Sequence, residues 1–141
     1  MTSRNGSKVS TQQVGTTVLV VMMEVDEADD AVFNKWYNEE HLPERMSIPG
    51  YISARRFMLD PEDGQANNVM RYLCIWEMED DSPLQSQFYQ DQNAKPTPTK
   101  DAAGAVVKQR ARGLYRQIFP AAGGYSDRVG YTYPDGTRIG A

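Results

Sequence analysis

In FNKWYNEEHLPERMSIPGYISARRF, residues 33–57, an amphipathic helix gives way to a Pro-Gly turn and then to a strand. Apolar side chains recur at spacings of three and four residues up to His41, which predicts a helix over about 27–41 with one buried face. Asp26 stands just before it and is expected to be its N-cap. Pro43 predicts that the helix stops nearby, because the residue before a proline is driven away from helical backbone angles.

Three strands are predicted around this helix. Residues 51–60 alternate between two faces, as a strand with different surroundings on each side does. Residues 61–67 have turn composition, and 68–78 form an apolar run that is expected to pair with 51–60 as a hairpin. Upstream, residues 14–25 form a continuous β-branched apolar run, typical of a strand buried on both faces.

The second half of the chain repeats the helix-then-strand order. Ser82 before Pro83 is a cap and first-turn arrangement, so a second helix is expected to begin there. The prolines of AKPTPT, residues 94–99, interrupt it, and 100–111 resume as a short helix. A fourth strand is expected over 112–121. The order β-α-β-β-α-β predicts an α+β fold of the ferredoxin-like split type, with both helices on one face of the sheet.

The other face of that sheet is predicted to be apolar and in need of a cover. Burial of each large apolar side chain contributes roughly 1.5 to 3 kcal/mol, so such a face is not expected to remain in water. Dimerisation of two copies face to face would bury it, which predicts a homodimer. The side chains concerned are Val18, Val20, Phe57, Leu73 and Ile118.

Composition narrows the class of protein. The 141 residues fit one domain over 14–120, flanked by an N-terminal tail, 1–13, and a C-terminal tail, 121–141. A net charge of −4 without a basic face argues against nucleic acid as a partner. Because no apolar run approaches the roughly 18 residues of a membrane span and no leader-like segment opens the chain, we expect no membrane partner and a cytoplasmic location. The single cysteine, Cys74, is expected to be a small buried side chain.

The order of elements, together with residues 33–57 and NAKPTPTKDA at 93–102, resembles the dimeric α+β barrel superfamily, and within it the EthD-like small bacterial proteins. The resemblance covers about 14–120 and implies a homodimer. Members of the superfamily include cofactor-free monooxygenases, muconolactone-type isomerases, polyketide cyclases and dehydratases, and haem enzymes. The positions that match the EthD-like pattern are Trp36, Tyr37, Glu40, His41, Pro43, Pro49, Gly50 and Tyr51.

His41 is the only histidine of the chain and the candidate catalytic residue. A metal centre is not expected, because one histidine cannot build a His-rich site and the acids beside it do not converge. Dinucleotide-binding, P-loop and GxSxG motifs are absent from the sequence, and a Ser-His-acid triad would have to be built around His41 from an unidentified serine. General acid-base chemistry remains, since a neutral imidazole near pH 7 can take up and return a proton. The alternative is a purely structural histidine that closes a helix.

The residues expected to bind substrate are aromatic or carry guanidinium groups. Because neighbouring residues of a strand point to opposite faces, either Arg55 or Arg56 should point towards an interior, where it could hold a carboxylate or a phenolate. The expected substrate-binding set is Trp36, Tyr37, Tyr51, Arg55, Arg71 and Tyr72.

Three functions remain open at this point. The first is a lyase, isomerase, cyclase or dehydratase that needs no cofactor and uses His41 on a small aromatic or polyketide-like compound. The second is a monooxygenase of the same fold, either cofactor-free or with haem on His41. The third is a dimeric binding module without catalysis. Fold-level resemblance does not choose among them.

Overall fold

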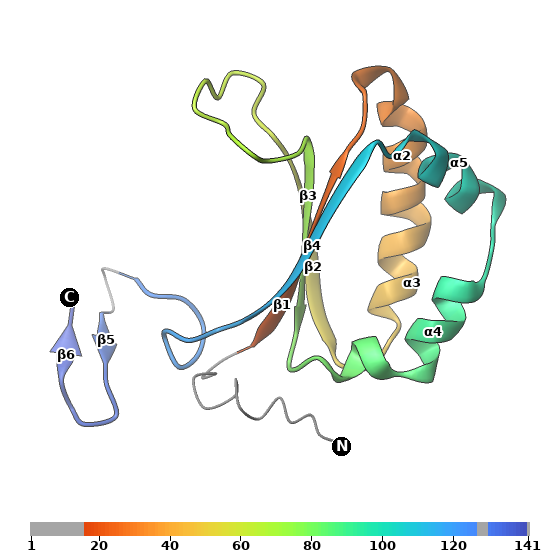
Figure 1. The fold of residues 1–141 in the computed structure, drawn as a ribbon. Helices are drawn as coiled ribbons and strands as arrows, with labels where there is room; N and C mark the ends of the chain where they lie inside the picture. Colours follow the sequence, from red (N-terminus) through yellow and green to blue (C-terminus); the bar gives the residue numbers. More distant parts are fainter. Residues whose placement is uncertain (1–15, 127–129, 141) are drawn as a thin grey trace.

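A computed structural model describes residues 16–126 and 130–140. Four antiparallel strands form one sheet in the order β2-β3-β1-β4, and all the labelled helices lie on the same side of it (Figure 1). This is the α+β, ferredoxin-like β-α-β-β-α-β arrangement that the sequence predicts. The elements are β1 (Thr17–Glu24), α2 (Asp30–Trp36), α3 (Leu42–Met46), β2 (Tyr51–Met58), β3 (Tyr72–Met78), α4 (Gln87–Ala94), α5 (Pro98–Val106) and β4 (Gln109–Arg116).

The first helical region is longer than predicted and is not α-helical throughout. A 3₁₀ turn, Glu27–Asp29, leads into α2, and a π-helical turn, Tyr37–His41, joins α2 to α3. The backbone N–H of Leu42 donates to the carbonyl of Tyr37, five residues back. This change of hydrogen-bond register places Pro43 in the first turn of α3, where a missing N–H is tolerated. The expected end at His41 was therefore wrong, because the helix continues to Met46.

The helix caps also differ from the predictions. Asp26 makes no capping hydrogen bond, and its carboxylate pairs instead with the ammonium of Lys108 at 2.8 Å. Ser82 opens only a short 3₁₀ turn, Ser82–Gln85, whereas Ser86 caps α4 by accepting from the N–H of Tyr89 at 3.2 Å. The predicted interruption by AKPTPT is confirmed, since α4 ends at Ala94 and α5 begins at Pro98.

Strand β2 carries an irregularity that changes which side chains face the helices. Its pairing with β3 shifts between Tyr51 and Ser53. Tyr51 lies opposite Met78 and Ser53 opposite Glu77, so a step of two residues on β2 matches a step of one residue on β3. A strict alternation would place Tyr51 on the same face as Arg55, as the sequence predicts. The shift instead brings Tyr51 onto the helix face, which it shares with Arg56.

The core lies between the sheet and the helices. Phe33 and Tyr37 from the helical side pack against Trp76 and Cys74 from β3, and all four are buried. The fourth strand begins at Gln109, three residues before the predicted start, so Arg110 belongs to it as well as Arg112. Within residues 16–126 and 130–140, every helix is too short or too polar to cross a bilayer.

The opposite face of the sheet is apolar, as predicted. Val20 pairs with Ile75 on one side and Gly113 on the other, and Phe57 pairs with Leu73. Phe57 is 41% exposed and Ile118, just past β4, is 65% exposed. No helix in the described part of the chain covers this face (Figure 1).

The C-terminal segment lies away from the helices (Figure 1). Its described part contains a short hairpin of β5 (Tyr131–Thr132) and β6 (Arg138–Ile139). The ring of Tyr131 packs on that of Phe119, with centroids 4.5 Å apart. The boundary between the domain and this segment, after residue 120, stays a prediction. The predicted N-terminal tail, 1–13, falls outside the described residues.

Candidate active site

A cavity of about 300 Å³ lies between the sheet and the helices, and His41 forms part of its wall. Strands β1, β2, β3 and β4 supply one side, and α2 with the π turn, α3, α4 and α5 supply the other. Its lining residues are mostly aromatic, apolar or basic. They are Leu19, Val21, Met23, Trp36, Tyr37, His41, Arg45, Tyr51, Trp76, Tyr89, Asn93, Lys100, Arg110 and Arg112.

The π turn fixes the position of the imidazole. Trp36 and His41 are five positions apart, and the wider turn brings them together, so their rings stack with centroids 4.4 Å apart and planes 20° apart. Two further rings lie edge-to-face with the imidazole. The centroid of Tyr37 is 5.1 Å from the imidazole centroid, and that of Trp76 is 5.4 Å from it. Single π turns in helices frequently occur at functional sites. The sequence analysis did not predict this turn.

The surroundings of His41 keep its ring neutral. Burial, followed by the positive charges of Arg45, Lys100 and Arg56, lowers its pKa from 6.5 to about 3. The imidazole has no hydrogen-bond partner among the residues that the structure describes, and it borders the cavity. A ligand in the cavity can therefore reach a neutral imidazole whose hydrogen-bonding capacity is unused.

Glu40, the neighbour of His41 in the sequence, is hydrogen-bonded to two threonines near the start of α5. Its carboxylate accepts hydrogen bonds from the hydroxyls of Thr97, at 2.6 Å, and Thr99. These bonds lower the pKa of Glu40, and Trp36 adds a further one. Thr97 is also the N-cap of α5. Glu40 thus ties the π turn to the start of α5.

The structure brings half of the expected substrate-binding residues together. Trp36, Tyr37 and Tyr51 line the cavity with His41. Burial raises the pKa of Tyr51 to about 12, so its phenol stays protonated and can donate a hydrogen bond. Tyr51 joins the site only because of the register shift in β2.

The other three expected residues lie elsewhere. Arg55 is exposed on the opposite face of the sheet, with its guanidinium 5.4 Å from the ring centre of Phe57. Arg71 donates two hydrogen bonds, of 3.0 and 2.8 Å, to the carboxylate of Asp30. The hydroxyl of Tyr72 donates to the same carboxylate at 2.5 Å. Arg71 and Tyr72 therefore belong to a network that holds the start of α2 against the start of β3.

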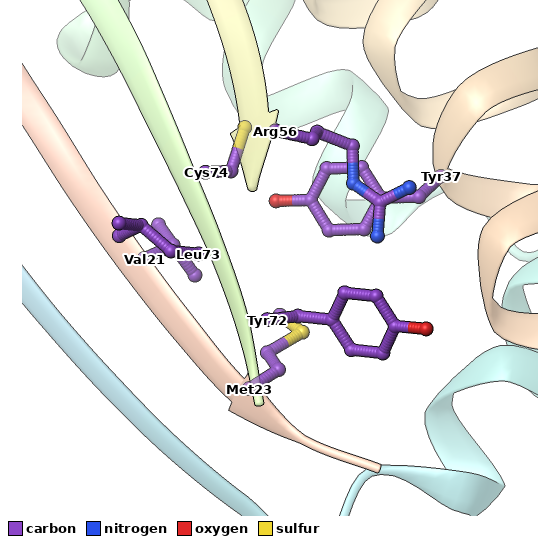
Figure 2. A pocket seen from close by; sticks show the side chains of 7 residues that line it. All are labelled: Val21, Met23, Tyr37, Arg56, Tyr72, Leu73 and Cys74. Atoms are coloured by element: carbon purple, nitrogen blue, oxygen red, sulfur yellow. The ribbon is translucent and has the colours of Figure 1, made fainter. Parts of the chain in front are cut away.

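Arg56 is the strand-two arginine that faces the helices, but it lies behind Tyr37 and does not line the His41 cavity. Figure 2 shows its guanidinium beside the ring of Tyr37, and the centroid distance is 4.2 Å. Its Nη1 donates to the amide oxygen of Asn38 at 2.7 Å, whereas its buried Nη2 has no partner in the described part of the chain. Burial raises the pKa of nearby Cys74 to about 11, so this thiol stays protonated.

Replacing Arg56 by Met is expected to leave the thermal midpoint unchanged or to raise it. Removal of an incompletely paired buried charge at constant side-chain volume is neutral or stabilising by about 1 to 4 kcal/mol. Arg71→Met is the matched control, because it leaves the carboxylate of Asp30 without its guanidinium and should destabilise by about 1.5 to 3 kcal/mol. Thermal unfolding of the two variants measures the difference. A large drop for Arg56→Met would mark Arg56 as a structural residue.

Several residues of the cavity were not among the expected site residues. Arg110 and Arg112 alternate with small or apolar residues in QRARGL, the pattern of a strand with one basic face, but the strand was expected to begin at 112. Arg45 and Lys100 come from separate helices, and no local pattern links them. Among the described residues, no group of three or more His, Cys, Asp or Glu is arranged to hold a metal ion.

The chain matches no protein-family model and no curated protein sequence. Its fold is similar to those of several solved structures. An ethyl tert-butyl ether D (EthD) family protein from Bacillus halodurans superposes with a TM-score of 0.51 and 14% identity, over 73% of this chain and 99% of that one. A protein from Shewanella loihica described as a proposed monooxygenase superposes with a TM-score of 0.50 and 20% identity, over 75% of this chain and 97% of that one. HapK from Hahella chejuensis superposes with a TM-score of 0.50 and 14% identity, over 78% of this chain and 97% of that one. The predicted resemblance to EthD-like proteins is thus confirmed at the level of the ferredoxin-like fold.

Proposed function

We propose that the protein is an enzyme that needs no cofactor and catalyses proton transfer on a small aromatic or polyketide-like compound, as a lyase, isomerase, cyclase or dehydratase does. The observation that carries this proposal is the neutral imidazole of His41, stacked on Trp36 at the wall of an aromatic cavity. A cavity of about 300 Å³ with an aromatic wall suits a flat ligand of a few fused rings.

In this proposal His41 removes a proton from an acidic carbon or hydroxyl and returns it to another atom of the same molecule or to a leaving group. The stack with Trp36 and the edge contacts with Tyr37 and Trp76 restrict rotation of the imidazole and exclude water from its faces. Tyr51 supplies a protonated phenol that can hydrogen-bond to a substrate oxygen on which negative charge develops. The residues therefore divide into one that moves a proton and others that orient the ring system.

The test of this proposal is solvent exchange of substrate protons without oxygen. Anthrone-like and β-diketone aromatic compounds are incubated with the enzyme in D₂O under anaerobic conditions, and mass spectrometry measures deuterium incorporation. Exchange or conversion above the buffer rate is expected. A reaction that proceeds only in the presence of dioxygen would reject the proposal in favour of a monooxygenase. A Soret band in the purified protein would indicate the haem-dependent version.

We further propose that two copies associate through the uncovered face of the sheet. Phe57, Tyr115 and Ile118 each leave 41% or more of their surface exposed on or beside that face. Light scattering is expected to give twice the chain mass of 15.9 kDa at micromolar concentration. Phe57→Lys should weaken this association, whereas Phe88→Lys, at a more exposed position on the helical side (61% against 41%), should not. A folded monomer at these concentrations would contradict the proposal.

A further inference from the structure

Four positively charged side chains from three separate parts of the chain meet at the His41 cavity. Arg45 comes from α3, Lys100 from α5, and Arg110 and Arg112 from β4. No Asp or Glu is among the residues that line this cavity. The chain as a whole carries a net charge of −4, so this local excess of positive charge runs against the overall balance. The four cations differ in how far the protein itself neutralises them.

The ammonium group of Lys100 is mostly engaged in hydrogen bonds within the protein. Its ammonium donates to the backbone carbonyls of Gln92, Asn93 and Lys95, at 3.2, 2.9 and 3.0 Å. These carbonyls belong to the end of α4, where a cation is favoured by the helix dipole. The carboxylate of Glu40 is also near enough for the charge of Lys100 to lower its pKa. Lys100 therefore joins α5 to α4, and its charge is partly offset.

Arg45 is held in place by neutral groups only. Its guanidinium donates to the amide oxygens of Gln92, at 3.0 Å, and Asn93, and it lies over the ring of Tyr89 at 4.3 Å. These contacts fix the orientation of the planar group without cancelling its charge. A fixed guanidinium beside a cavity is a ready partner for a carboxylate or phenolate oxygen.

The guanidinium groups of Arg110 and Arg112 have no hydrogen-bond or ion-pair partner among the described residues. They pair in register with Met23 and Val21, which line the same cavity, so their side chains lie on the helix face of the edge strand. Both are exposed, which places them at the mouth of the cavity. Arg112 lies near enough to the phenol of Tyr51 for its positive charge to act on the pKa of that group, in the downward direction and against the larger effect of burial. Two guanidinium groups thus stand on one side of the mouth, with Arg45 on the helical side.

We propose that the ligand of this cavity is an aromatic anion, whose carboxylate or phenolate group is held by Arg110, Arg112 and Arg45 while its rings lie against the aromatic wall beside His41. This inference rests on the proposed function, because it takes the His41 cavity as the substrate site. Guanidinium groups without carboxylate partners bind anions with charge-assisted hydrogen bonds, which are stronger than neutral ones. The bound anion would also offset the positive charges that disfavour protonation of His41, so substrate binding would make the imidazole a better base.

The experiment compares three probes with one ring system and three charges, 1-naphthoate, 1-naphthamide and 1-naphthylmethylammonium, by isothermal titration calorimetry with the full chain at pH 7. We expect naphthoate to bind at least about tenfold more tightly than naphthamide, and the ammonium compound to bind most weakly. The double variant Arg110→Gln/Arg112→Gln should lose at least about tenfold in naphthoate affinity and keep its naphthamide affinity within roughly twofold. Arg110→Lys/Arg112→Lys should keep most of the preference.

The matched control is Lys35→Gln/Lys95→Gln, which makes the same change in net charge at exposed positions outside the cavity. It should bind naphthoate as the unmodified chain does. Equal affinity for naphthoate and naphthamide, weak binding of all three probes, or an equal loss in the control would each overturn the inference. The proposed function is tested separately, because a preference for naphthoate together with undiminished turnover in His41→Gln would reject proton transfer by His41 and leave anion binding intact.

Discussion

Replacing His41 by Gln is expected to lower turnover by at least about 100-fold, the loss typical of removing a general acid or base. Gln has a similar length and keeps hydrogen-bonding capacity, but it cannot take up and return a proton in this pH range. The loss should appear in the catalytic rate constant more than in substrate binding, because the aromatic wall and the arginines of the cavity are unchanged.

Two measurements make this prediction specific. The thermal midpoint of His41→Gln should stay close to that of the unmodified chain, because the imidazole has no hydrogen-bond partner among the described residues. Glu39→Gln is the control on the same π turn, and it should keep full activity. Among the residues that the structure describes, the exposed carboxylate of Glu39 pairs only with Lys35. Near-full activity of His41→Gln would contradict the acid-base role. A large loss of stability with activity retained would make His41 a structural residue.

Stability is expected to fall by about 2 kcal/mol between pH 7 and pH 5 because of His41 alone. In the folded protein its pKa is lowered to about 3, whereas in the unfolded chain it returns to about 6.5. Between these values the unfolded state binds the proton and the folded state excludes it, so acidification favours unfolding. Each pH unit within the window costs up to about 1.4 kcal/mol.

Urea unfolding at a fixed protein concentration, at pH 7, 6 and 5, measures this dependence. The range ends above the region where most carboxylates titrate, so the histidine dominates it. His41→Gln should flatten the profile over the same interval, since Gln does not titrate. An unchanged slope in the variant would show that other groups carry the dependence. An anionic ligand should also reduce the slope, because it raises the proton affinity of the folded state.

The fold could be predicted from the sequence because its main signals are local. The apolar run at 14–25, the alternation of 51–60 and the proline pair of AKPTPT each act on their own segment, and together they define the order of elements. The predicted helix end was wrong for a different reason, and so was the capping bond expected of Asp26, although Asp26 holds the N-cap position. Asp26 found an ion pair with Lys108, and Pro43 was accommodated by a change of hydrogen-bond register, which depends on contacts distant in sequence.

The candidate site could be predicted only in part. The meeting of Tyr37 and His41 follows from their spacing of four residues, whereas the stack of His41 on Trp36, five residues away, depends on the π turn. The choice between Arg55 and Arg56 depended on which face of β2 met the helices, and alternation alone does not say which face that is. The basic side of the cavity is assembled from α3, α5 and β4. Such an assembly is a tertiary feature, and no pattern within a single segment indicates it.

The π turn over Tyr37–His41 can also be viewed as a matter of chain length. It holds one residue more than an α-helical path over the same rise would need, so the segments on either side are out of phase by one position. Deleting Asn38 would leave Trp36 and His41 four positions apart, the spacing of neighbours on one face of a regular α-helix, so the imidazole would keep its place beside Trp36. The extra residue is thus taken up locally by the wider turn. What it adds is the exposed side chain of Asn38, which accepts a hydrogen bond from Arg56.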